Sequence, residues 1–326
     1  MTEVRTGNRK RDLAPFFSMV LLIVLFTAIT PRFISVSNIM TISKQVSING
    51  ILGIAMFLIV LTGGIDISMG STLSLLCVLT GFLESRSIPF LMILFIVLLA
   101  GAIVGYLKGL LVTKIKLPDL IVTLAAKNLI RGIALMFSVE TYIITSPIMT
   151  SLGAGQIFGI LPNPFMCFIL VALVIAVVLS RTRLGRRIYA VGGNSDAAMQ
   201  AGIHVGRTKR NAYMLSGMLV AIAAVLYSSI YQNILASKIG GDTENTLLAI
   251  VLLGGATMSG GYGNILGIVF GAFTMAILNN GMILARSTDY WVTALTGILI
   301  LASMLVQYLQ NEGIFKKKRS GGALNK

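Results

Sequence analysis

Apolar segments of about the length of a membrane span recur along almost the whole chain, and this pattern restricts the fold more than any other feature. A bilayer-spanning helix needs about 20 mostly apolar residues. Ten segments come close to that requirement: 14–30, 46–63, 69–83, 89–107, 118–138, 164–180, 212–233, 247–260, 264–284 and 290–309. Only 11% of the residues are charged, against about 25% in soluble domains. The sequence therefore predicts an all-α integral membrane protein with about ten transmembrane helices, some short or broken, over 14–310, between short terminal segments at 1–13 and 311–326.

Positive charge gathers between these segments and sets their expected orientation. The formal net charge is +15, but aromatic residues are not interleaved with the basic ones, which argues against nucleic acid as a partner. Lys and Arg next to membrane spans stay on the cytoplasmic side. With ten spans and a cytoplasmic N-terminus, all the large basic clusters fall on that side: 5–11, 108–116, 181–210 and 316–319. Both termini and the 181–210 loop are therefore predicted to be cytoplasmic.

The stretch LTGGIDISMGS at 61–71 places a carboxylate inside an apolar block. A carboxylate in a membrane is costly and usually faces the protein interior. We expect Asp66 to cap the next helix by accepting from the N–H of Ser68 or Met69. The neighbouring Gly63, Gly64 and Gly70 allow close helix approach. These residues predict a helix break, or gate, near the cytoplasmic end of a pathway, where Asp66→Asn keeps activity and Asp66→Ala loses it.

Other polar side chains also lie within the predicted spans. Lys127 and Arg131 are four residues apart and so lie on one helix face. Lys127 is expected to pair with Asp66 or with backbone carbonyls. Asn279 and Asn280 either line a pathway or bridge helices by hydrogen bonds. The single histidine and the two cysteines form no metal-ligand set, so the sequence predicts no metal and no cofactor.

The cytoplasmic loop at 181–210 contains signals for one short helix. Asn194 or Ser195 can cap its N-terminus after Gly193, and Gly202 can end it in the left-handed conformation. Ala198 is small, and Ile203 follows as an apolar side chain. Because such a short helix is unstable alone, it must dock on its own bundle or in a groove of a cytoplasmic partner.

Five motifs in order resemble the permease subunits of sugar-type ATP-binding-cassette importers, the ribose, xylose and galactose group. They are LTGGIDISMGSTLSL, LPDLIVTLAAKNLIRGIAL, GRRIYAVGGNSDAAMQAGIHV, LLAIVLLGGATMSGGYGNILGIVFGAF and LNNGMILARSTDYW. Arg131 matches the Arg-Gly of that family's pattern, whereas a lysine at 127 departs from it.

The resemblance implies a permease in a bacterial inner membrane that pairs with a second permease subunit, a cytoplasmic ATPase subunit and a periplasmic sugar-binding protein. No Walker motif occurs in the chain, so ATP hydrolysis is expected on separate subunits and not here. A secondary transporter is the alternative, but it would need more acidic residues within the spans than Asp66. A membrane-embedded enzyme is a third class, and no catalytic constellation supports it. The residues do not identify the solute.

Overall fold

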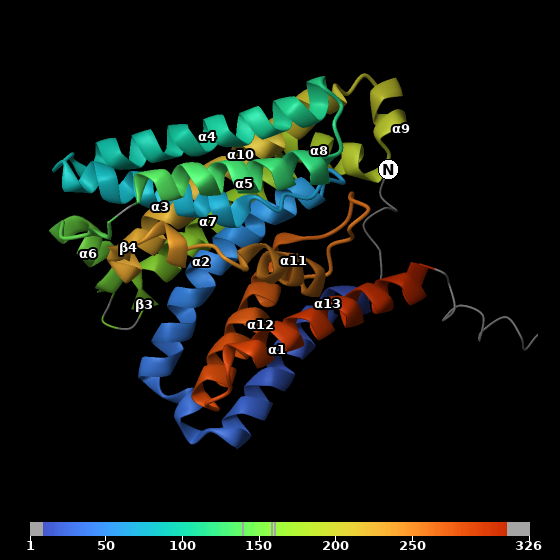
Figure 1. Ribbon diagram of the computed structural model, residues 1–326. Coiled ribbons are helices and arrows are strands. Elements are labelled where there is room, and N and C mark those ends of the chain that lie inside the picture. Colours follow the sequence, from blue (N-terminus) through green and yellow to red (C-terminus); the bar gives the residue numbers. More distant parts are fainter. Residues whose placement is uncertain (1–8, 139, 158, 160, 312–326) are drawn as a thin grey trace, which may run out of the picture.

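The computed structural model describes residues 9–138, 140–157, 159 and 161–311, and it is almost entirely helical (Figure 1). The long helices are α1 (Arg9–Ile29), α2 (Val36–Val60), α3 (Met69–Ser85), α4 (Phe90–Lys114), α5 (Asp119–Phe137), α7 (Asn163–Arg181), α10 (Val205–Tyr231), α12 (Ile265–Leu284) and α13 (Asp289–Asn311). The shorter helices are η2 (Pro31–Ile34), α6 (Pro147–Ala154), α8 (Arg183–Gly193), α9 (Ser195–Gln200), η3 (Ala236–Lys238) and α11 (Thr243–Leu253). The strands are β1 (Tyr142–Ile143), β2 (Gln156–Ile157), β3 (Leu161–Pro162) and β4 (Asn233–Ile234).

Each of the ten predicted segments contains a helix, and the all-helical membrane class is confirmed. Among the described residues, six helices are long and apolar enough to cross a bilayer: α2, α4, α5, α7, α10 and α12. Three shorter apolar stretches follow, in α1, α3 and α13, while α11 has only 11 residues. The count of ten spans and their orientation therefore stay predictions.

Helix α2 forms the centre of the molecule. It is apolar all round, and 83% of its most apolar window is buried, as expected for a helix surrounded by others. Its N-terminus is capped by Ser35, whose hydroxyl accepts from the N–H of Asn38. In Figure 1, α2 runs from the group of α3, α4, α5, α7 and α10 into the group of α1, α11, α12 and α13. The two groups therefore share α2 as their common core.

Helices α4 and α10 pack with their backbones in direct contact. A Cβ built on Gly101 would lie 2.4 Å from the carbonyl oxygen of Gly217, and one on Gly105 would lie 2.2 Å from that of Tyr213. Glycines at four-residue spacing let the two backbones touch, as is common between membrane helices. This contact fixes the middle of α4 against the first half of α10.

The segment between α5 and α7 covers one end of the bundle. It holds α6 and the two-stranded antiparallel pairs β1–β4 and β2–β3. Glu84, at the end of α3, accepts from the backbone N–H groups of Thr145 and Ser146 at 2.9 and 2.7 Å. These contacts satisfy a buried carboxylate that lies just beyond the predicted third span.

The 181–210 loop and the described chain ends lie on one side of the molecule. In Figure 1, α8 and α9, the start of α1 and the end of α13 all lie toward the right, away from α6 and β3. This placement agrees with the predicted shared side of both termini and the 181–210 loop. Residues 1–8 and 312–326, which include most of the terminal basic clusters, lie outside the described residues.

Candidate functional site

The predicted helix break lies between α2, which ends at Val60, and α3, which begins at Met69. Gly63 adopts a positive φ of 76° as the chain turns out of α2. A Cβ on Gly64 would lie 2.3 Å from Oδ2 of Asp119, and one on Gly70 would lie 2.3 Å from the carbonyl oxygen of Gly240. The glycines therefore allow close approach, as the sequence predicts.

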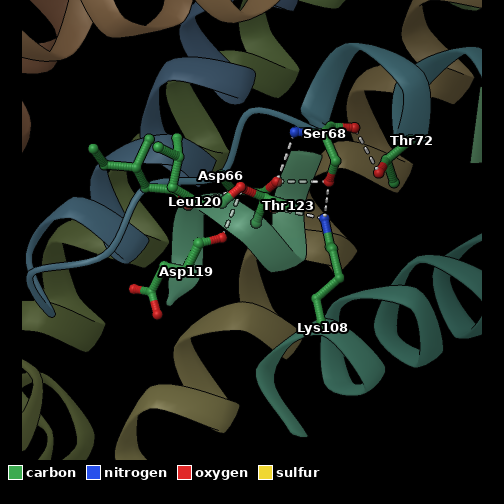
Figure 2. A network of polar contacts seen from close by, with 8 residues as sticks. Asp66, Ser68, Thr72, Lys108, Asp119, Leu120 and Thr123 are labelled. Carbon is green, nitrogen blue, oxygen red and sulfur yellow. Dashed lines mark hydrogen bonds and ion pairs between the residues drawn. The ribbon is translucent and has the colours of Figure 1, made fainter. Parts of the chain in front are cut away.

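Asp66 lies in this break and is 1% exposed. Its Oδ1 accepts from the N–H of Ser68 at 2.8 Å and from the Ser68 hydroxyl at 2.6 Å. The expected bond to the Ser68 N–H is confirmed, but the predicted helix cap is not: Ser68 itself is the N-cap residue of α3, its side chain makes no capping bond, and Asp66 orders the turn just before the helix. Its Oδ2 also accepts from Nζ of Lys108 at 2.5 Å, and Lys108 donates to the Ser68 hydroxyl at 2.9 Å. Figure 2 shows Lys108 extending from α4 into this cluster.

The predicted pairing of Lys127 with Asp66 is wrong. Lys108 is the partner, although the sequence analysis counted it among the cytoplasmic basic residues. Helix α4 continues to Lys114, past the predicted end at 107, and Lys108 is only 5% exposed. Its spacing from Gly101, Gly105 and Val112 places it on the buried face of α4, and this spacing is the signal that could have identified it.

Lys127 and Arg131 instead join α5 to the segment before and at the start of α11. Lys127 forms an ion pair with Glu244, which is 7% exposed. Arg131 donates to the carbonyl oxygens of Ile239 and Ser237. The two cations thus have separate acceptors, which removes the difficulty of placing like charges on one helix face.

Asn279 lines a cavity of about 610 Å³ between α2, α11, α12 and α13, whereas the adjacent Asn280 is 4% exposed and lies outside the lining. The sequence left open whether these residues line a pathway or bridge helices. In the described structure the Oδ1 atoms of both lack a hydrogen-bond partner. The other amide side chains of the lining are Gln45, Asn49 and Asn245.

The 181–210 loop folds into α8 and α9, which we call the coupling element. Asn194 caps α9, its Oδ1 accepting from the N–H groups of Asp196 and Ala197 at 3.0 and 2.9 Å. Gly202, with φ of 78°, follows α9, and the N–H of Ile203 donates to the carbonyl oxygen of Ala198 at 3.0 Å. The predicted cap and the predicted left-handed glycine are confirmed: Asn194 begins α9, and Gly202 and Ile203 end it in a Schellman motif.

Ala198 is 5% exposed, so its side chain packs against the chain itself, which is the first of the two docking alternatives that the sequence left open. Successive residues of an α-helix point in different directions around its axis, so Ala198 lies on the docked face of α9 while its neighbour can face outward. Met199 is 63% exposed and presents an apolar side chain outward. Gly193 and Asn194 are exposed, while Ile203 lines a shallow hollow beside Arg183 and Arg187.

The coupling element contacts both Gly-rich span ends through bare backbone. A Cβ on Gly192 would lie 1.7 Å from the carbonyl oxygen of Leu61 and 2.5 Å from the nitrogen of Gly261. The N–H of Gly261 donates to the same Leu61 oxygen at 3.0 Å. We call this contact of Leu61, Gly192 and Gly261 the glycine junction. The sequence analysis did not identify it, although each of its three segments carries a Gly-Gly pair.

The sequence profile of the branched-chain amino acid transport system/permease component family matches residues 38–304. The chain belongs to this family of transport permeases. The permease is 32% identical over 295 residues to the ribose import permease protein of Haemophilus influenzae, covering 89% of this chain and 91% of that protein. It is 34% identical over 301 residues to the ribose import permease protein of Bacillus subtilis, covering 91% and 92%.

A further relative of the permease is named for a different solute. The autoinducer 2 import system permease protein of Klebsiella pneumoniae is 29% identical over 320 residues, covering 97% of this chain and 92% of that protein. No solved structure shows a significant match. The resemblance drawn from the five motifs is confirmed, and the permease is a multi-pass membrane protein of a transport system. The secondary-transporter alternative also loses its one candidate acid, since Asp66 is engaged by Lys108.

Proposed function

We propose that this permease is the membrane subunit of an ATP-driven importer that carries a small sugar-like solute across a bacterial inner membrane. The observation that carries the proposal is the glycine junction, because it joins the coupling element to the ends of both Gly-interrupted spans. A cytoplasmic ATPase subunit docks on the coupling element. A periplasmic binding protein delivers the solute, and a second permease subunit, identical or closely similar, completes the pathway.

The geometry supports a direct mechanical route for alternating access. Displacement of α8 moves Gly192, which is in contact with Leu61 at the end of α2 and with Gly261 after α11. Close-packed backbone contacts cannot deform continuously, so a small shift is passed on to both loops. Asp66 lies five residues after Leu61, and its buried ion pair with Lys108 holds the start of α3 against α4. The break at 61–68 is therefore the part of the pathway that the coupling element is placed to move.

The relatives favour a sugar-like solute over an amino acid. Two of them are named for ribose and one for autoinducer 2, whereas the wider family is described by branched-chain amino acids. For the choice of solute, the names of the relatives have greater weight than the description of the wider family, because these relatives align with about nine-tenths of the chain.

Met199→Glu tests the docking face of the coupling element. The change places a carboxylate on the exposed apolar position of α9, where an interface would have to desolvate it. We expect normal amounts of the variant in the membrane, a loss of co-purification with the ATPase subunit and a loss of solute-stimulated ATP hydrolysis of about tenfold or more, equivalent to about 1.4 kcal/mol of docking.

Met199→Leu is the matched control, because it keeps an apolar side chain of similar volume and should bind the ATPase as the wild type does. Retention of the ATPase by Met199→Glu would remove α9 from the interface. Ala198→Glu is less suitable, because burial of Ala198 means that a glutamate would also disturb the packing of the coupling element itself.

The orientation of the permease is tested by reporter fusions. A phosphatase that is active only in the periplasm, fused after Gly193, should be inactive, because the basic 181–210 loop is expected in the cytoplasm. The same reporter fused after Ser87, in the loop between α3 and α4, should be active. Reversed activities would invert the proposed topology and place the coupling element on the wrong side for an ATPase.

A further inference from the structure

The cavity between α2, α11, α12 and α13 is unusually polar for its place in an apolar bundle. Nine of its thirteen lining residues carry a polar side chain, including four amides and three threonines. We propose that Gln45, Asn49 and Asn279 bind the hydroxyl groups of a neutral, polyhydroxylated solute in this cavity. The inference rests on the proposed import function and assigns the solute contact and its specificity to named residues.

Buried amide oxygens in and beside the cavity lack partners. Oε1 of Gln45 and Oδ1 of Asn279, both on lining residues, accept no hydrogen bond within the described part of the chain. Oδ1 of Asn280, on the same turn of α12, accepts none either. Buried polar atoms are nearly always paired, and an exception indicates strain, a missing water or a functional partner. The two unpaired oxygens on lining residues, those of Gln45 and Asn279, indicate a partner that arrives from outside the protein.

The chemistry of the lining suits an uncharged solute. An amide side chain offers both donors and acceptors, as a hydroxyl group does, so amides and threonines match a sugar on several sides. Among the described residues, the lining contains no Lys, Arg or His, and Asp242 is its one charged residue. A zwitterionic amino acid would bring a carboxylate that no cation in this lining could pair. The lining therefore favours a sugar over an amino acid.

The position and size of the cavity fit a solute pathway. The volume of about 610 Å³ lies within the usual range of about 300–1,000 Å³ for small-molecule sites. Asn279 lies five residues before the end of α12 at Leu284, which corresponds to about 8 Å along the helix. Gln45 and Asn49 are one turn apart on α2. With the predicted orientation, the cavity opens in the outer half of the membrane, where a delivered solute enters.

The experiment compares Gln45→Leu and Asn279→Leu with the wild type in proteoliposomes that contain the permease, its ATPase and its binding protein. The probes are radiolabelled D-ribose and L-leucine. We expect each variant to reduce ribose uptake by about tenfold, the effect of one lost buried hydrogen bond. Neither variant should lower the midpoint of thermal unfolding, because each removes an oxygen that has no partner in the unoccupied protein.

Asn163→Leu is the matched control. Asn163 lies outside the cavity, and its Nδ2 donates to the carbonyl oxygen of Ser151 at 2.9 Å. This variant should keep ribose uptake and lose a little thermal stability, the reverse of the cavity variants.

The outcomes separate the two proposals. If both cavity variants take up ribose at the wild-type rate, the binding-site proposal is wrong and the import function still stands. Lower unfolding midpoints for both cavity variants would assign these amides a structural role instead. ATP-dependent uptake of leucine but not of ribose by the wild type would overturn the sugar-like solute and the site together.

Discussion

Replacing Asp66 by alanine should lower the free energy of unfolding of the permease by about 3–5 kcal/mol, the usual cost of removing one member of a buried ion pair. Lys108 is 5% exposed and Asp66 is 1% exposed, so neither charge is stabilised by water once its partner is lost. Thermal unfolding of the detergent-purified protein measures the loss, and a reduced amount in the membrane should accompany it.

The double variant Asp66→Ala/Lys108→Met provides the control. It removes both charges and replaces the lysine stem by an apolar side chain of similar length, so most of the lost stability should return. Asp66→Asn keeps an acceptor for the Ser68 N–H but leaves Lys108 without a counter-ion. It should therefore be less stable than the wild type, in contrast to the sequence-based expectation of near-normal behaviour. Equal stability of Asp66→Ala and the double variant would show that the pair contributes nothing beyond the bond from the Ser68 N–H.

The local part of this architecture could be predicted from the sequence because its signals are local. Apolar length predicts the helices, and the order of Asn194, Ala198 and Gly202 predicts both ends of α9. A cap or a left-handed glycine acts within a few residues of its own position. Helix starts were less accurate: α2 begins at Val36, ten residues before the predicted span at 46, because its first turns are polar.

The contacts that join distant helices were not predictable in the same way. Asp66 and Lys108 are 42 residues apart, and Lys127 and Glu244 are 117 apart. Periodicity shows which face of a helix is buried but not which other helix covers it. Asp66 therefore has several candidate cations in the sequence. Lys127 lies within a predicted span and so is the expected partner, whereas Lys108 lies just beyond the predicted end of its span, at 107.

The cavity shows both effects at once. Asn279 was singled out because a polar side chain within an apolar span is conspicuous. Gln45 was not singled out, because it lay just outside the predicted span, and Asn49 was treated as part of the apolar run. Only the packing of α2 against α11 and α12 places these amides around one cavity.

Gly192→Ala should abolish most solute uptake, because the glycine junction has no room for a side chain. The added Cβ would lie 1.7 Å from the Leu61 carbonyl oxygen and 2.5 Å from the Gly261 nitrogen, and both of these atoms belong to packed backbone. Overpacking of this kind costs about 1–3 kcal/mol, so the docked arrangement of α8 against the two span ends should be lost or displaced. We expect uptake by proteoliposomes that contain the complete importer to fall by about tenfold or more.

Basal ATP hydrolysis distinguishes lost transmission from misfolding. The proposed ATPase contact lies on α9, the helix after α8, where Met199 stays exposed. A folded Gly192→Ala variant should therefore keep its basal hydrolysis. Gly206→Ala is the matched control at the same end of the molecule. Its Cβ would meet only Thr113 Cβ at 3.6 Å, an ordinary contact, and alanine is the better helix former. Uptake by Gly206→Ala should therefore equal that of the wild type.

Normal transport by Gly192→Ala would show that the glycine junction can accommodate a methyl group. Motion of the coupling element would then have to reach the helix break at 61–68 by another route. One such route is the ion pair of Lys209 on α10 with Asp119 on α5.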